Sequence, residues 1–107
     1  MITVTNFQSG ELKIDGDAGP SLRLSREAAS RLIMSARMHS VAHFVQKLPQ
    51  LITEPVLLQN LLSLFEQAQG SARWNLKERF ARLRTLTKDY QPSHPEQVVE
   101  SIVLRLS

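Results

Sequence analysis

Two histidines at helical spacing are the first residues whose types suggest chemistry. His39 and His43 lie four positions apart, so a helix would place both imidazoles on one face, which suits two ligands of one metal ion. The residues between them include no glutamate that would serve as the base of a metalloprotease. His94, the third histidine, lies in a proline-rich segment. We therefore predict no metal site and interpret the pair as surface histidines.

Other patterns typical of catalysis are missing from the sequence. The chain has no cysteine, which excludes a thiolate nucleophile, a thiolate metal site and a disulfide. Its four glycines fit no phosphate-binding loop, and no nucleophile elbow is present. Asp15 and Asp17 alternate as at the start of a calcium loop, but the later ligands do not follow. We expect a protein that is not an enzyme, holds no cofactor and has no evident small-molecule substrate.

A cationic segment carries the strongest functional signal. Residues 71–90 hold six lysines and arginines against two carboxylates, in a chain of formal net charge +3. Four of these cations share a stripe about 60° wide when the segment is drawn as a helix: Arg73, Lys77, Arg84 and Lys88. Trp74 lies beside this stripe, where its ring can stack on an exposed base. The stripe predicts contact with an acidic protein or with nucleic-acid phosphates, and a solvated helix face remains the plain alternative.

An N-terminal β-hairpin precedes the helices that would carry these residues. β-Branched and polar residues alternate over residues 1–7, which favours a strand. A turn signal follows at residues 8–10, and the alternation resumes at residues 12–14. Residues 21–24 are predicted to form a third short strand.

Helical periodicity and capping residues mark the rest of the chain. The expected helices cover residues 25–47, 53–69, 72–90 and 95–105. Ser25 and Thr53 are predicted to cap the first two, and Pro49 to follow the end of the first. The β-branched end of the last segment leaves a strand open as an alternative. Gly70 between two helices also fits a helix-turn-helix, which a plain αα-hairpin explains equally well.

These elements predict an α+β fold that is mainly α. A short N-terminal β-hairpin at residues ~1–24 would be followed by three or four packed helices. The length of 107 residues corresponds to one domain over residues 1–107, because domains most often contain ~100–150 residues.

An apolar stripe on the first helix is a second candidate surface. Its predicted interface residues are Met34, Met38, Val41 and Val45. Methionine adapts to differently shaped partners, so this stripe favours a homodimer seam or a docking groove. Burial of the stripe against the apolar helix at 53–69 is an equally good explanation.

Compartment and function follow from these patterns as expectations. The N-terminus has no signal-peptide pattern, and no apolar run approaches the ~20 residues that a membrane span requires, which favours the cytoplasm and no membrane contact. We predict a small non-catalytic adaptor that acts by protein–protein binding. The alternative is a DNA- or RNA-binding regulator that uses the helix at 72–90.

Overall fold

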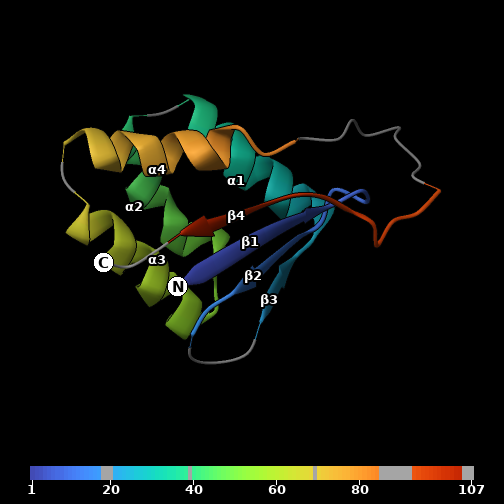
Figure 1. The fold of residues 1–107 in the computed structure, drawn as a ribbon. Helices are drawn as coiled ribbons and strands as arrows, with labels where there is room; N and C mark the ends of the chain where they lie inside the picture. Colours follow the sequence, from blue (N-terminus) through green and yellow to red (C-terminus); the bar gives the residue numbers. More distant parts are fainter. Residues whose placement is uncertain (18–20, 39, 69, 85–92, 105–107) are drawn as a thin grey trace.

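Three strands, four helices and a final strand make up the described part of the chain (Figure 1). The computed structural model describes residues 1–17, 21–38, 40–68, 70–84 and 93–104. The strands are β1 (Ile2–Phe7), β2 (Leu12–Asp15), β3 (Leu22–Leu24) and β4 (Val98–Leu104). The helices are α1 (Arg26–Met38), α2 (Val41–Leu51), α3 (Pro55–Gln67) and α4 (Ser71–Ala81). The predicted class, α+β and mainly α with an N-terminal hairpin, is confirmed.

The strands form one antiparallel sheet in the order β3-β2-β1-β4 (Figure 1). Successive side chains of a strand alternate between faces, so Ile2, Val4 and Asn6 of β1 are buried on the helix side. Gly10 closes the turn between β1 and β2 with a φ of 91°, a backbone conformation that favours glycine. The hairpin and the third short strand therefore stand as predicted.

β4 replaces the helix predicted for residues 95–105. This segment pairs with β1 from Ile2 opposite Leu104 to Phe7 opposite Val98, with a register shift between Asn6 and Phe7. The strand alternative was the correct one, because the β-branched residues of the segment fit a pleated surface and β1 offers them a free edge. The residues before β4 form a loop, in which the carbonyl of Pro95 accepts a hydrogen bond from the amide of Ser9 at 3.1 Å.

The helix predicted over 25–47 is two helices. α1 ends at Met38, and Ser40 caps α2, where its Oγ accepts a hydrogen bond from the amide of His43 at 3.3 Å. Ser25 caps α1 as predicted, because its Oγ accepts from the amide of Ala28 at 3.2 Å. Pro49 does not end the helix but lies inside α2, near its C-terminus. The break separates the predicted apolar stripe into two helices with different orientations.

α3 is shorter than predicted at both ends, and α4 is shorter at its C-terminal end. Glu54, not Thr53, precedes α3, and it makes no side-chain capping bond. α4 ends at Ala81 rather than near residue 90, and the chain turns at Arg82. Leu83 beyond the turn is fully buried. Leu83 is thus buried from outside the helix. The apolar periodicity of residues 72–90 predicted a longer helix and did not indicate this end.

The core lies between the helices and one face of the sheet. Three phenylalanines from three helices meet at its centre, with ring centroids 5.7 to 6.5 Å apart: Phe44, Phe65 and Phe80. Ile2, Val4, Leu12 and Ile14 of β1 and β2 are buried in the same apolar cluster. This packing fixes α2, α3 and α4 relative to one another, and so fixes the surfaces between them.

Candidate functional site

The predicted cationic stripe is not one helical surface. α4 ends at Ala81, so it carries Arg73 and Lys77, whereas Arg84 lies three residues beyond its end. Lys88 lies outside the described residues. Arg84 is exposed, and its backbone is tied to the sheet: its amide donates to Glu100 Oε1 and its carbonyl accepts from Asn6 Nδ2 at 3.0 Å. Of the four cations of the predicted stripe, α4 therefore carries only Arg73 and Lys77.

Lys77 is buried, with only 2% of its surface exposed. Its Nζ lies 4.8 Å from the ring centroid of Trp74 and 4.0 Å from a carboxylate oxygen of Glu78. Trp74 is half-exposed and covers the ammonium group, which is attracted by the electron-rich face of the indole. Lys77 and Trp74 thus contact each other, and the charge of Lys77 is withdrawn from the surface that a partner would meet.

Two further arginines bind backbone carbonyls within the protein. Arg37 of α1 donates from Nε to the carbonyl of Ala81 at 2.6 Å and from Nη2 to the carbonyl of Leu83 at 3.1 Å. The carbonyl of Ala81 is at the end of α4, where a helix lacks its own donors, and Leu83 lies just beyond that end. Arg79 donates to the carbonyl of Val103 in β4 at 3.1 Å. Both side chains join elements of the fold, which reduces the cationic surface available to nucleic acid.

A groove between α1 and α2 contains two of the predicted interface residues. It has a volume of about 310 Å³. Its lining residues recur at helical spacing on the two helices: Arg31, Met34, Ser35 and Met38 on α1, and Lys47, Gln50 and Leu51 on α2. Met34 is 42% exposed and Met38 71% exposed. The groove thus offers adaptable apolar side chains at the surface.

The charge of this groove has one sign. Arg31 and Lys47 lie among its described lining residues, which include no carboxylate. Ser35 and Gln50 add groups that can form hydrogen bonds. An apolar groove with cations on both helices complements a segment that has apolar and acidic side chains.

Val41 and Val45 do not line the groove with the methionines. Both are partly buried and pack against the core. The core face of α1 is formed by Ala29, Leu32, Ile33 and Ala36. Met34 and Met38 lie on a different face of α1, whereas the two valines of α2 pack against the core. The structure brings Met34 and Met38 together and separates them from the other two predicted interface residues.

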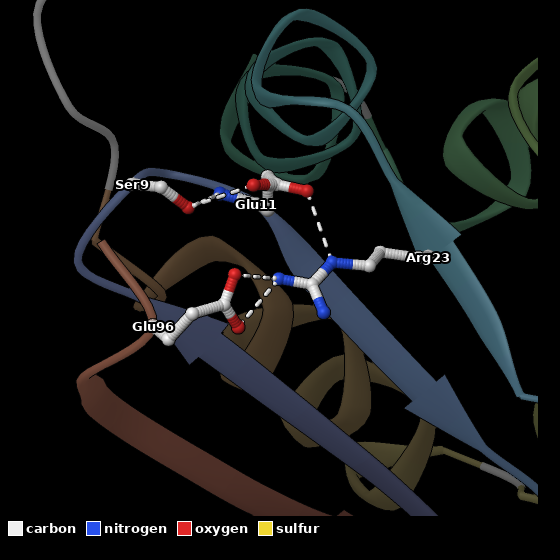
Figure 2. Close-up of polar contacts among 4 residues, drawn as sticks. All are labelled: Ser9, Glu11, Arg23 and Glu96. Carbon is white, nitrogen blue, oxygen red and sulfur yellow. Dashed lines mark hydrogen bonds and ion pairs between the residues drawn. The ribbon is translucent and has the colours of Figure 1, made fainter.

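Arg23 of β3 forms a clasp across the sheet that the sequence analysis did not single out. It donates from Nε to Glu11 at 3.0 Å and from Nη2 to both carboxylate oxygens of Glu96 at 2.8 and 2.9 Å (Figure 2). Ser9 donates to the other oxygen of Glu11, and the guanidinium lies 4.7 Å from the centroid of the Phe7 ring. The hydrogen bonds to Glu96 and then to Glu11 raise the pKa of Arg23. The clasp joins β3 to the loop before β4.

Metal-ligating clusters and helices that could span a membrane are both absent from the described residues. No group of three or more metal-ligating side chains gathers there, and His39 is outside that set. None of the helices in the described ranges has the length and apolar character needed to cross a bilayer. No protein-family model, curated protein or solved structure matches the chain. A function must therefore be inferred from the chemistry of its own surfaces.

Proposed function

We propose that the protein is a non-catalytic, cytoplasmic adaptor that binds an acidic, amphipathic segment of another protein in the groove between α1 and α2. The observation that carries this proposal is the pairing of two exposed methionines with two cations in a groove whose described lining has no carboxylate. A partner helix with apolar residues one turn apart would place them against Met34, Met38 and Leu51. Its flanking carboxylates would face Arg31 and Lys47.

The methionines would supply most of the binding free energy. Complete burial of an exposed methionine side chain contributes about 1.5–3 kcal/mol. Met38, at 71% exposure, has more surface to lose than Met34 at 42%. Exposed ion pairs contribute about 0.2–1 kcal/mol each, so Arg31 and Lys47 would mainly select an acidic partner and orient it.

Self-association through the same groove has less support. Two copies that met groove to groove would bring Arg31 and Lys47 of one copy towards the same cations of the other. Like charges at an interface oppose association. A homodimer is therefore an outcome that the experiment below must exclude.

The nucleic-acid alternative also has less support than a protein partner. Lys77 is covered by Trp74, and the guanidinium groups of Arg37 and Arg79 bind internal carbonyls. Arg73 and Arg84 remain candidate contacts for phosphates, although they do not share a continuous helix. A direct comparison of the two ligand classes separates the proposals.

Fluorescence anisotropy with labelled model ligands makes that comparison. The first probe is a helical peptide with leucines at positions i, i+3, i+4 and i+7 and glutamates elsewhere. The second peptide has lysines in place of the glutamates, and the third ligand is a duplex DNA. We expect the acidic peptide to bind at least tenfold more tightly than the lysine peptide, in a 1:1 complex. Tighter binding of DNA, or a dimer that excludes the peptide, would contradict the proposal.

Matched variants locate the binding. We expect the double variant M34A/M38A, which truncates both groove methionines, to bind the acidic peptide about tenfold more weakly. This loss of affinity is equivalent to about 1.4 kcal/mol. The control is V56A on α3, which truncates a 44% exposed apolar residue outside the groove and should leave the affinity unchanged. Equal losses in the two proteins would show that binding does not use the groove.

A further inference from the structure

A second hollow lies between α2, α3 and the first turn of α4. Its volume is about 490 Å³, within the range of small-molecule sites. The described residues that line it are Val45, Gln59, Leu62, Ser63, Glu66 and Arg73. Four of them recur on α3 at spacings of three and four residues, so they form one face of that helix. The hollow shares no lining residue with the groove between α1 and α2.

Arg73 lines this hollow, and its guanidinium carries an unsatisfied donor. Its Nε is buried and has no hydrogen-bond acceptor within the described part of the chain. A buried donor without an acceptor is costly, and guanidinium groups favour carboxylate oxygens. Glu66 lines the same hollow, yet no ion pair joins it to Arg73 in the described residues. Opposite charges thus face one space without neutralising each other directly.

This separation of charges restricts the ligand. A phosphate or sulfate ion would meet the carboxylate of Glu66, and a simple cation would meet Arg73. A molecule with adjacent positive and negative groups satisfies both residues at once. Val45 and Leu62 provide apolar wall on the same hollow, which suits an aliphatic or aromatic side chain.

We propose that this hollow binds a free α-amino acid with an apolar side chain. The carboxylate of the amino acid accepts hydrogen bonds from Arg73, and its ammonium group donates to Glu66. Ser63 already accepts a hydrogen bond from Gln67 Nε2 at 3.0 Å, so its hydroxyl proton is available to the ligand carboxylate. The amide of Gln59 lies at the other end of the same α3 face. The site is a sensor-like addition to the proposed adaptor and does not depend on the partner groove.

Chemical-shift perturbation with the ¹⁵N-labelled 107-residue chain tests the site. The probe is L-leucine, compared with N-acetyl-L-leucine, which lacks the ammonium group, and with L-leucinamide, which lacks the carboxylate. We expect L-leucine to shift amide signals of residues 59–66 and 73 in a saturable manner. Each of the two analogues should bind at least tenfold more weakly. Absence of saturable shifts with L-leucine at millimolar concentration, or equal binding of either analogue, would overturn the proposal.

Charge-removing variants assign the two contacts. R73Q and E66Q are each expected to lower the affinity for L-leucine at least tenfold, because each variant loses a hydrogen bond to a charged group. The controls are R82Q and E27Q, which remove exposed charges outside the hollow. If R73Q failed to fold, the affinity of E66Q for L-leucine would still test the site, provided that the dispersion of its amide signals shows a folded protein. Unchanged affinity in a folded E66Q protein, or equal losses in the controls, would refute the assignment.

Discussion

The contact between Arg37 and the end of α4 leads to a quantitative prediction for R37M. Methionine keeps much of the side-chain volume but removes the donors to the carbonyls of Ala81 and Leu83. Hydrogen bonds to a charged group contribute about 1.5–3 kcal/mol each. Arg37 is exposed, so water can replace part of both bonds. We therefore expect a total loss of about 1.5–3 kcal/mol, rather than twice the single-bond value.

Urea denaturation followed by circular dichroism measures this loss. With a slope of about 1–3 kcal/mol/M for a small domain, the midpoint should fall by roughly 1 M, and the slope itself should not change. R31M is the matched control, because Arg31 is an exposed arginine on the same helix and lines the groove between α1 and α2. Its stability should stay within about 0.5 kcal/mol of the parent protein. If R37M were as stable as R31M, the claim that Arg37 joins α1 to α4 would be wrong.

Three further substitutions test other parts of the fold. In urea titrations, K77M should leave the free energy of unfolding unchanged or raise it by up to about 2 kcal/mol, because an apolar group replaces a buried ammonium. A loss of stability above about 1 kcal/mol would contradict this expectation. In the same assay, G70A should lower the free energy of unfolding by about 1–2 kcal/mol, because Gly70 has a φ of 57° that L-residues adopt at a cost. No neighbour lies within 4 Å of the added Cβ, so the loss would come from the backbone alone. An unchanged midpoint would show that the strain is relieved. R23Q should lower the melting temperature by the same amount from about pH 6 to pH 9, because a raised arginine pKa gives stability that is complete below the ordinary arginine pKa and is lost only as the pH rises above it. A melting-temperature difference that varied across this pH range would show that another group governs the clasp.

Local patterns in the sequence predicted the elements that depend on local interactions. The hairpin followed from alternation around a turn, because residues 2–7 and 12–15 are neighbours in the chain as well as in the sheet. The Ser25 cap of α1 followed in the same way. Each of these features involves residues only a few positions apart.

Features that depend on distant residues were missed or misplaced. β4 is a strand because β1, more than 90 residues earlier, supplies its hydrogen-bonding partner. The apolar periodicity from Met34 to Val45 continues from α1 into α2, so only the cap by Ser40 indicates that two helices are present. The methionines face a groove because α1 and α2 pack side by side, which no single-helix projection contains.

The charged residues illustrate the same limit. A helical projection placed Lys77 on the cationic stripe, but it could not show that Trp74 would cover the ammonium. Arg31 and Lys47, which the projection left aside, come together in the groove through tertiary packing. The opposed pair Arg73 and Glu66 is also a product of packing between α3 and α4. The types of residues were visible in the sequence, whereas their grouping was not.

Methionine methyl NMR tests the central claim most directly. The chain contains three methionines, and Met1 is about as exposed as the groove residue Met34, at 50% against 42%. Protein with ¹³C-labelled methionine methyl groups is titrated with the acidic amphipathic peptide. We predict that the signals of Met34 and Met38 shift in a saturable manner while the signal of Met1 stays in place. Saturable binding of the peptide with all three signals unmoved, or with Met1 shifted as much as Met38, would contradict the account of the groove as the protein-binding site.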